Sequence, residues 1–406
     1  MKKWNIKLSE FGENTENHLR LLIENEKIKG NEEKTKITMR LGDPSVFGNF
    51  PPHPSIKSAI TEAIQRDKFT YAGNVGYIFA REAVAEYASH MGEIKADDVI
   101  LTNCCSMSLE MCILALANRG ENILVPKPCY HYETFTNGIG IEIQYYNLDP
   151  ENDWQIDLVH LESLINEKTK AIVVNSPGNP CGNVFSLQHM FEIIDIAERH
   201  CLPIISDEIY EFVTFGDVKH YSFASVSKNV PILVCSGLTK RFLTPAIRCG
   251  WIIISDRGNK LQEIRKGLIQ KIGGRGFGPN STIQHALSNI LKNVPQTFFN
   301  NVNARVDNNA RLLFDHLNKI KGLRPIMPKG SIFMLLKIEL EKFPKISSSM
   351  EFMQLLIKEQ NVYTFPSECF HFPGYLRLVL TIPTDVLLET CTRFEEFCNK
   401  YLNNEQ

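Results

Sequence analysis

The chain has 406 residues, of which 43% are hydrophobic, and its formal net charge at pH 7 is −2. This length and composition suit one large or two medium domains with a packed core, and the small charge argues against wholesale binding of nucleic acid or membranes. No apolar run approaches the roughly 18 residues that cross a bilayer. The eleven histidines include no metal-binding spacing, so we expect no metal site.

The N-terminal segment is polar and lysine-rich up to about residue 40, with one amphipathic patch at Leu19–Ile23. Such a segment is typical of an arm that wraps a partner subunit or frays. Its start lacks the apolar core of a signal peptide and the Arg- and Ser-rich character of a transit peptide. The chain also has eleven cysteines, an odd number without a CxxC pair. We therefore expect reduced thiols and a cytoplasmic protein.

A loop and two helices precede the first strands. Leu41–Pro54 is rich in Gly and Pro, which predicts a loop. Hydrophobic periodicity predicts helices over Ser55–Arg66 and Ile78–His90, with Phe69–Gly76 as a glycine-punctuated turn between them. This turn contains Tyr71, and a tyrosine in such a turn is more often a packing residue than a functional one.

From residue 98 onward, strands alternate with helices. The expected strands are Val99–Thr102, Ile123–Val125, Ala171–Val174, Pro203–Ser206, Ile232–Val234 and Trp251–Ile254. The expected helices between them are Ser106–Ala117, Leu158–Glu167 and Gln188–Cys201. This alternation predicts an α/β fold with a mainly parallel sheet covered by helices. Because ligands bind beyond the carboxyl ends of such strands, the residues that follow each strand are candidate site residues.

Polar side chains follow three of these strands. Ser106 suits a helix N-cap, where backbone N–H groups can bind a phosphate, although a plain structural cap explains it equally well. Asn175 and Asn179 lie in the rigid turn NSPGNPCG. Asp207 follows the next strand, with Tyr210 one helical step later on the same side. A buried carboxylate at that position needs a cationic or donor partner, for which a protonated ring nitrogen would serve.

The fourth strand end carries Lys240. A lysine is ordinarily a solvated surface charge. Here hydroxyls and cations crowd the same segment, namely Ser236, Thr239, Arg241 and Arg248. Nearby cations disfavour the ammonium form of a lysine. A deprotonated lysine can form a Schiff base, and an arginine can hold an anion.

The alternation stops beyond residue 257. Long helices are expected at Lys260–Gln270 and Thr297–Ile320. Gly273–Gly278 (GGRGFG) lies between them and follows a helix rather than a strand, so we expect a loop and no nucleotide-binding motif.

The last stretch predicts a second, α+β domain. Its expected strands are Ser331–Leu336 and Leu376–Ile382, and its expected helices are Ser348–Gln360 and Thr384–Leu402. Arg377 interrupts an apolar strand, and an arginine there needs a carboxylate, which either Glu339 or a substrate would supply.

Five segments, in this order, resemble the class I, fold type I pyridoxal-phosphate-dependent aminotransferases, most closely their tyrosine aminotransferase branch. They are LGDPSVFGN, VNSPGNPCGNVFS, SDEIY, SGLTKRFLTPAIRCGWIII and FPSECFHFPGYLRLVLTIP. The resemblance runs from about Leu41 to Cys398, and five matches in the family's order make coincidence improbable. It implies a large cofactor-binding domain over 51–296 with a mainly parallel, seven-stranded-type sheet. A smaller α+β domain over 297–406 and an arm with a joining segment over 1–50 would complete the chain.

The resemblance also implies roles around the ring of a pyridoxal 5′-phosphate cofactor. Lys240 resembles the Schiff-base lysine, which holds the cofactor and later shuttles a proton. Asp207 matches the carboxylate that keeps the pyridine nitrogen protonated. Tyr210 and Asn179 match the pair that hydrogen-bonds the ring's 3-oxygen, and Tyr130 matches the stacking aromatic residue. The catalytic residues implied are thus Lys240, Asp207 and Tyr210.

Other roles concern the phosphate and the substrate. The residues that match the phosphate cradle are Cys105, Ser106 and Arg248, and Tyr71 matches a phosphate-binding tyrosine from the partner subunit of a homodimer. The residues that match the substrate clamp are Gly42, Asn179 and Arg377, with Arg377 gripping the α-carboxylate in a bidentate pair. Two departures concern structure. Cys104 stands where a glycine is expected, which would strain the turn if its φ were positive, and Glu133 stands where a tyrosine is common.

The resemblance implies a ping-pong aminotransferase that moves the amino group of tyrosine or another aromatic amino acid to 2-oxoglutarate. Four aromatic side chains could bury such a substrate: Phe47, Tyr71, Phe277 and Phe365. The alternatives are a cysteine-conjugate β-lyase with the same cofactor and a broad-specificity alanine/aromatic aminotransferase. A non-catalytic relative is disfavoured, because all of the catalytic groups are present.

Overall fold

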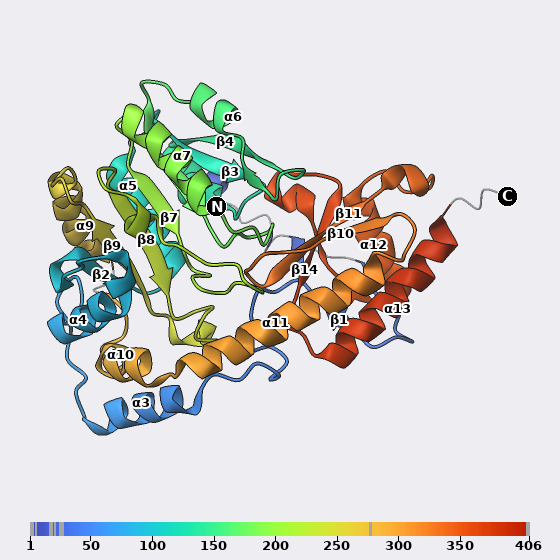
Figure 1. Cartoon of the computed structure of the whole chain (residues 1–406), viewed down its shortest axis with the longest axis horizontal. Helices are drawn as coiled ribbons and strands as arrows, with labels where there is room; N and C mark the ends of the chain where they lie inside the picture. Colours follow the sequence, from blue (N-terminus) through green and yellow to red (C-terminus); the bar gives the residue numbers. More distant parts are fainter. Residues whose placement is uncertain are drawn as a thin grey trace.

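The computed structural model describes residues 4, 6–15, 19, 22–23, 28–275 and 278–402. Its main feature is an eight-stranded sheet with the order β2-β9-β8-β7-β6-β3-β4-β5 (Figure 1). The strands are β2 (Val99–Thr102), β3 (Asn122–Lys127), β4 (Glu142–Asp149), β5 (Gln155–Ile156), β6 (Thr169–Asn175), β7 (Ile204–Asp207), β8 (Ile232–Gly237) and β9 (Gly250–Ser255). Strands β8, β7, β6, β3 and β4 run parallel, whereas β9, β2 and β5 pair antiparallel with their neighbours. The prediction of a mainly parallel sheet is confirmed.

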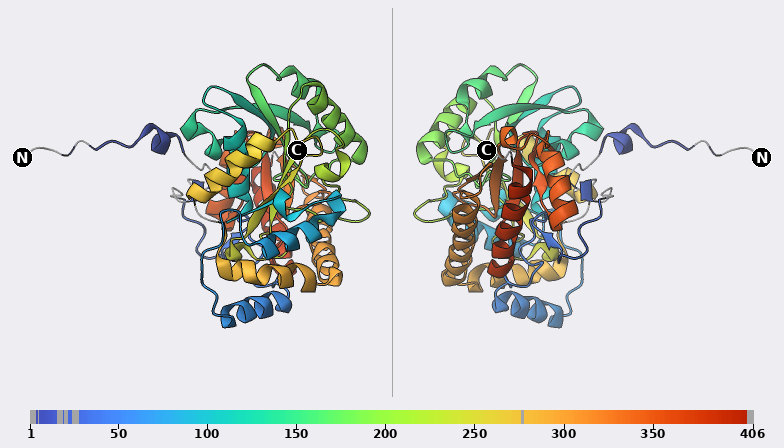
Figure 2. Two further views of the ribbon diagram at one scale, coloured as in Figure 1. Left: turned by 90° about the vertical axis from the view of Figure 1, so that its left-hand side faces the viewer. Right: turned by 90° about the vertical axis from the view of Figure 1, so that its right-hand side faces the viewer.

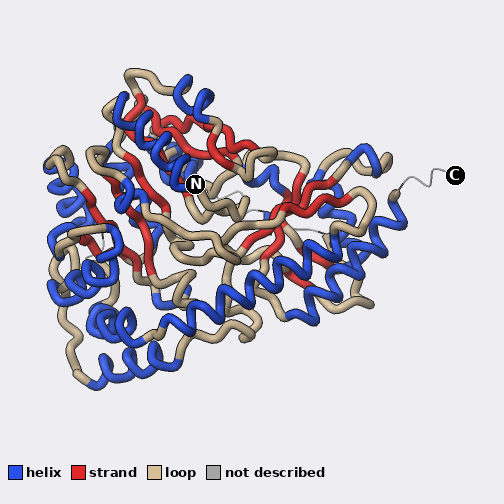
Figure 3. The backbone as a smooth tube through the Cα atoms, viewed as in Figure 1, coloured by secondary structure: helices blue, strands red, loops and turns tan. Residues whose placement is uncertain are grey.

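Helices cover both faces of this sheet (Figure 3). On one face, Ile205 of β7 and Leu233 of β8 belong to the core that includes residues of α5 (Cys105–Leu116) and α9 (Gln262–Arg275). On the other face, Ile204 and Val234 belong to the core that includes residues of α3, α4, α7 and α10. These helices are α3 (Pro54–Gln65), α4 (Ile78–Tyr87), α7 (Leu187–Arg199) and α10 (Ser281–Asn293). Burial on both faces explains why the strands are continuous apolar runs.

A second, antiparallel sheet has the order β10-β11-β14-β13. Its strands are β10 (Leu323–Ile326), β11 (Phe333–Ile338), β14 (Tyr375–Val379) and β13 (Phe365–Pro366). It packs with α11 (Gln296–Leu317), α12 (Ser349–Gln360) and α13 (Thr384–Tyr401) in a separate core. Helix α11 runs from the large sheet to the small one (Figure 1). The domain boundaries expected from the sequence stay predictions.

The N-terminal segment reaches both parts of the molecule. Its strand β1 (Ile37–Thr38) pairs in parallel with β12 (Val362–Tyr363) beside the small sheet. Its helix α1 (Glu10–Asn14) lies at the outer edge of the molecule in Figure 2, near the 3₁₀ turn Asn137–Ile139. No helix in the described part of the chain is long and apolar enough to cross a membrane.

Several elements differ from those expected. Strand β4 and helix α10 were not predicted, and the predicted loop Gly273–Gly278 begins as the last turn of α9, with residues 276–277 outside the described residues. A Cβ at Gly273 would lie 2.4 Å from the Asn74 side chain. This helical glycine therefore allows α9 to pack closely against the turn Phe69–Gly76, which contains Asn74. Helix α5 begins at Cys105 with Cys104 as its N-cap. The prediction that Ser106 is the N-cap is therefore wrong, because Ser106 lies in the first turn.

Candidate active site

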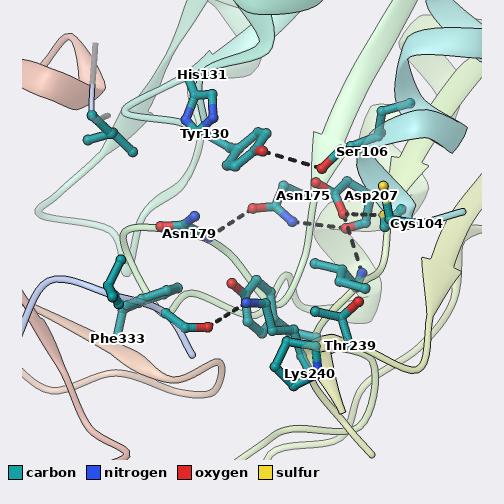
Figure 4. Close-up of a pocket in the computed structure, with 18 of the residues that line it drawn as sticks. Cys104, Ser106, Tyr130, His131, Asn175, Asn179, Asp207, Thr239, Lys240 and Phe333 are labelled. Atoms are coloured by element: carbon teal, nitrogen blue, oxygen red, sulfur yellow. Dashed lines mark hydrogen bonds between the residues drawn. The ribbon is translucent and has the colours of Figure 1, made fainter. Parts of the chain in front are cut away.

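A cavity of about 630 Å³ lies where the carboxyl ends of β6, β7 and β8 face the small sheet (Figure 4). The lining residues from the large sheet and its loops include Cys105, Ser106, Tyr130, Asn175, Asn179, Asp207, Tyr210, Lys240 and Arg248. The small sheet contributes Phe333, Phe365 and Arg377, and the N-terminal segment contributes Leu19 and Gly42. The residues that the family resemblance assigned to the cofactor, the phosphate and the substrate clamp therefore line one cavity, with the exception of Tyr71.

The parallel register explains why the polar strand ends meet. Asn175 pairs with Asp207, and Asp207 pairs with Cys235. The Asn175 side-chain amide donates to the backbone carbonyl of Asp207 at 2.9 Å, and its Oδ1 accepts from the backbone N–H of Asn179 at 2.8 Å. The strand ends are thus held together by buried hydrogen bonds that aim Asp207 and Asn179 into the cavity.

Asp207 is 4% exposed and has three donors. The Tyr132 hydroxyl donates to its Oδ2 at 3.0 Å, while the Cys105 thiol at 3.6 Å and the Ile209 N–H at 3.3 Å donate to Oδ1. Burial raises the pKa of Asp207 to about 6, and the hydrogen bond from Tyr132 opposes this shift. The carboxylate has no cation in direct contact within the described chain, so a protonated ring nitrogen would complete its partners.

Tyr132 was missed from the sequence. It is fully buried, and its ring packs edge-on against Tyr130 at 5.6 Å between centroids. The sequence did show a second tyrosine two residues after Tyr130, the stacking candidate. It could not identify the contact, because Asp207 lies 75 residues further along the chain.

Lys240 lies in the loop after β8, and its Nζ donates to the backbone carbonyl of Gly42 at 2.5 Å. Burial lowers the pKa of Lys240 to about 8, Asp43 opposes the shift, and the cations Arg377 and Arg248 add to it. Of the two cations expected from the sequence to depress this pKa, Arg248 contributes, whereas the second contribution comes from Arg377 and not from Arg241. The Arg241 guanidinium turns away from the cavity and donates to the Tyr87 hydroxyl at 2.6 Å.

The first turn of α5 and Arg248 form a site for an anion. A Cβ at Gly250 would lie 2.5 Å from the Cys104 carbonyl carbon and 2.7 Å from the Cys105 nitrogen. The start of β9 therefore lies directly against the N-terminus of α5. This close approach explains why Arg248, two residues earlier, lines the same cavity as Ser106. Unpaired N–H groups and the helix dipole favour a phosphate there. Cys104 has an extended φ of −175°, so the expected backbone strain at this residue is absent.

Arg377 reaches the cavity from β14 and is only 3% exposed. Its Nη1 donates to Asn179 Oδ1 at 2.9 Å and its Nη2 donates to the Arg40 carbonyl at 2.6 Å. Its Nε has no hydrogen-bond partner. Burial lowers the pKa of Arg377 to about 10, so the group remains a cation at neutral pH.

The partners of Arg377 in the described chain are neutral acceptors. Neither Glu339 nor another described carboxylate forms a salt bridge with it. The suggestion that Glu339 satisfies this arginine is therefore wrong. A buried cation held only by neutral groups favours an anionic ligand.

Tyr210 and Tyr130 line the same cavity. Tyr210 lies in a turn after β7, and not in the helical step expected from the sequence. Burial raises the pKa of Tyr210 well above its usual range and that of Tyr130 to about 12, so both hydroxyls are protonated donors at neutral pH. The Tyr130 hydroxyl lies 3.3 Å from Ser106 Oγ, which joins the stacking candidate to the anion site.

Comparison with known proteins identifies this arrangement. Residues 34–394 match the family model for aminotransferase class I and II. The chain belongs to this family. The tyrosine aminotransferase of Mus musculus is 44% identical over 404 residues, which covers 98% of this chain and 88% of the relative. That of Homo sapiens is 42% identical with the same coverage. The solved tyrosine aminotransferase from Leishmania infantum has a TM-score of 0.94 at 31% identity, covering 99% of this chain and 100% of the other.

Some residues expected at the active site of this aminotransferase lie elsewhere. Tyr71 is 89% exposed and does not line the cavity of its own chain, and Phe47 is also outside the lining. Phe365 does line the cavity, whereas Phe277 lies outside the described residues. Glu133 is buried, and its Oε1 lies 3.4 Å from Nε2 of His371 in the small-sheet region.

Proposed function

We propose that this aminotransferase uses pyridoxal 5′-phosphate to move the amino group of an aromatic amino acid, tyrosine first, to 2-oxoglutarate. One observation carries the proposal: Lys240, with a pKa lowered to about 8, lines a single cavity with a buried Arg377 that has no carboxylate partner in the described chain. A nucleophilic amine and a site for a carboxylate are what an amino-acid substrate and an aldehyde cofactor require together.

The residues present fit this cofactor. The first turn of α5 with Ser106 and Arg248 suits its phosphate, and Asp207, which has donors but no cation in contact, suits its ring nitrogen. When bound, the cofactor supplies an aldehyde that takes up the amino group and a ring that withdraws electrons from the substrate Cα. The residues that would hold it are Cys105, Ser106, Tyr130, Asn179, Asp207, Tyr210, Lys240 and Arg248 of one subunit, with Tyr71 of the other.

The chain's own groups then perform the remaining tasks. Arg377 orients the substrate by its α-carboxylate, and Asn179 holds the guanidinium in place through Oδ1. Lys240 is suited to take and return the Cα proton, since its pKa lies near neutral pH. Because donor and acceptor share one cavity, the amino acid must leave as a 2-oxo acid before 2-oxoglutarate binds, which gives a ping-pong sequence.

The substrate preference rests on two supports. The similar proteins from mouse and human are named tyrosine aminotransferases. The wall of the cavity beside Arg377 contains Phe333, Phe365 and Leu19, which can bury an aromatic side chain. An apolar wall of this kind accepts other hydrophobic amino acids less favourably, and a broad alanine/aromatic preference is the runner-up.

A panel of amino acids tests this function. We expect single-turnover conversion of the bound cofactor to its amine form to be fastest with tyrosine or another aromatic amino acid, because the apolar wall buries the ring. Multiple turnovers should require 2-oxoglutarate. The measurement is the change in cofactor absorbance, with amino-acid and 2-oxo-acid products quantified. Alanine converted faster than every aromatic amino acid would favour the runner-up. Pyruvate and ammonia released from a cysteine conjugate without an acceptor would favour the β-lyase.

We also propose that the chain acts as a homodimer in which Tyr71 completes the partner's phosphate site. Tyr71 lies outside the cavity of its own chain although it matches a phosphate-binding residue of the family. Large apolar side chains that precede and follow it in the chain are also exposed, including Phe69, Leu41 and Ile78. A second copy of the chain would cover this surface and bring Tyr71 to the other cavity.

Mixed dimers test the shared site. Lys240→Ala and Tyr71→Ala are each expected to be poorly active alone. When the two variants are refolded together or co-expressed, the mixed dimer should regain one intact site, because Lys240 from one subunit meets Tyr71 from the other. We expect activity well above that of either parent, measured as specific activity at fixed total protein. No gain in a sample shown to contain mixed dimers would mean that Tyr71 serves its own chain or none.

Two further expectations also stand as proposals. The eleven cysteines are all free, which suits a reducing compartment such as the cytosol. We place the large cofactor-binding domain at 51–296 and the small domain at 297–406, since the two sheets have separate hydrophobic cores.

A further inference from the structure

Two charged residues directly follow catalytic candidates and take no part in the cavity. Glu211 follows Tyr210 and is 1% exposed, and Arg241 follows Lys240 and is also buried. Neither side chain lines the cavity. Burying a charge is costly unless the group is hydrogen-bonded, so both residues require a structural explanation.

Tyr87, the last residue of α4, joins the two charges. Its hydroxyl donates to Glu211 Oε1 at 2.9 Å and accepts from Arg241 Nη1 at 2.6 Å. Ser236 also donates to Glu211 Oε1, at 3.0 Å. We call Tyr87, Glu211, Ser236 and Arg241 the Tyr87 network. The described chain contains no direct salt bridge between Glu211 and Arg241, so the single hydroxyl of Tyr87 mediates their contact.

The Tyr87 network holds the Lys240 loop on both sides of the lysine. Ser236 precedes Lys240 by four residues and Arg241 follows it directly. The Arg241 guanidinium also packs over the rings of Phe212 and Phe299 at 4.3 and 4.4 Å. Residues 211 and 212 continue the segment that begins at Asp207, so the network ties the Lys240 loop to the loop that carries Asp207 and Tyr210.

The sheet alone does not hold these loops in register. Strands β7 and β8 pair up to Asp207 and Cys235, and one further backbone hydrogen bond joins Glu208 N to the Cys235 carbonyl. Beyond this point β7 and β8 are no longer paired with each other, and Lys240 lies five residues past Cys235, although β8 stays paired with β9 as far as Gly237. The side chains of the Tyr87 network bridge the two loops where the ladder between β7 and β8 has ended.

We propose that the Tyr87 network positions the Lys240 amine relative to Asp207 and Tyr210, with Glu211, Tyr87 and Arg241 as positioning residues. This inference rests on the proposed function for the roles of Lys240, Asp207 and Tyr210. Loss of the Tyr87 hydroxyl leaves Arg241 Nη1 without its acceptor and Glu211 Oε1 with Ser236 as its remaining donor, so Glu211 and Arg241 are no longer joined and the Lys240 loop is free to shift. A displacement of about 1 Å at a reacting group can cost on the order of 100-fold in rate.

The test compares Tyr87→Phe with Tyr146→Phe in the full-length chain. Tyr146 is a fully buried tyrosine, whereas Tyr87 is partly buried, and the Tyr146 hydroxyl donates to the Val173 carbonyl at 2.7 Å. The first readout needs no turnover: trace acetylation of Lys240 by acetic anhydride across pH, quantified by peptide mass spectrometry in protein without cofactor. The second is the split between kcat and KM in cofactor-loaded protein.

We expect Tyr87→Phe to raise the pH midpoint of Lys240 acetylation by about one unit, since a loosened loop admits water. We expect it to lower kcat roughly tenfold or more with a much smaller change in KM. Tyr146→Phe should leave the apparent acid dissociation constant of Lys240, taken from the acetylation midpoint, and kcat each within about twofold of the wild type. Ser236→Ala, which removes the second tie, should move both readouts in the same direction if Tyr87→Phe does not fold. Glu211→Gln keeps an acceptor for the Tyr87 hydroxyl, so this variant should retain most of the wild-type kcat and a midpoint close to that of the wild type.

A lower melting temperature in Tyr87→Phe, with the acetylation midpoint and kcat unchanged, would overturn the proposal, because the network would then be merely structural. Equal effects of Tyr87→Phe and Tyr146→Phe would overturn it as well. The proposed function fails by a different result, namely the absence of transamination in the wild type. The acetylation midpoint is measured without the cofactor, so it tests the positioning role of the network independently of the proposed function.

Discussion

Replacing Lys240 by alanine should reduce kcat by on the order of 10⁴-fold or more, while the protein still folds and retains part of its affinity for the cofactor phosphate. Alanine removes both the amine that holds the cofactor and the group suited to move the Cα proton, and each contribution is large. Ser106 and Arg248, which are proposed to hold the phosphate, remain in this variant. The measurement is single-turnover absorbance with tyrosine, together with cofactor binding by equilibrium dialysis.

Borohydride reduction with peptide mapping supplies the direct control. In the wild type the reduced cofactor should be found on the peptide that carries Lys240, and in Lys240→Ala the label should be absent. Lys329→Ala is a matched control, since Lys329 is paired with Asp153 outside the cavity and its loss should leave activity and labelling unchanged. A label on another lysine of the wild type would contradict the assignment of Lys240.

Replacing Arg377 by alanine should cost roughly 3 kcal/mol of transition-state binding, about 150-fold in kcat/KM. The guanidinium is buried, charged at neutral pH, and held by Asn179 and the Arg40 carbonyl, so its remaining hydrogen-bonding capacity is directed to a ligand. The proposed charged, bidentate contact to the α-carboxylate would disappear with it. The measurement is kcat/KM for tyrosine with saturating 2-oxoglutarate.

Tyramine, which has the amine and ring of tyrosine but no carboxylate, serves as a control substrate. It distinguishes loss of the carboxylate contact from general damage to the site. The wild type should strongly prefer tyrosine over tyramine, and Arg377→Ala should lose most of that preference. Arg377→Lys retains a charge but not the fork, so it should fall between the two. An unchanged tyrosine-to-tyramine ratio in Arg377→Ala, or an unchanged kcat/KM, would remove Arg377 from the substrate clamp.

The comparison of sequence and structure shows where local patterns suffice. Buried strands of a parallel sheet are continuous apolar runs, so their ends are visible in the sequence, and the polar residues that follow them must meet at one edge. This is why Asn179, Asp207 and Lys240 could be named together before any coordinates. Their roles as cofactor ligands still stand as proposals.

Sequence patterns gave no prediction, or a wrong one, where contacts between distant residues decide the structure. Nothing in the surroundings of Tyr132 indicates that its hydroxyl bonds Asp207, 75 residues away. Cys104 was expected to be strained only on the assumption of a positive φ, and the extended backbone before α5 removes that condition. The helical Gly273 was missed because glycine is a poor helix former in isolation, whereas here its missing side chain allows contact with Asn74.

The amino-acid sequence by itself determined the α/β architecture, the family and the group of residues at the strand ends, because periodicity, strand length and motif order are properties of neighbouring residues. The tertiary structure decided which charges face the cavity. Arg377 and Arg248 lie near Lys240, whereas Arg241, its immediate neighbour in the chain, is buried against Tyr87 on the opposite side. Successive side chains in a loop point in different directions, and only the packing of distant elements selects which of them reaches the site.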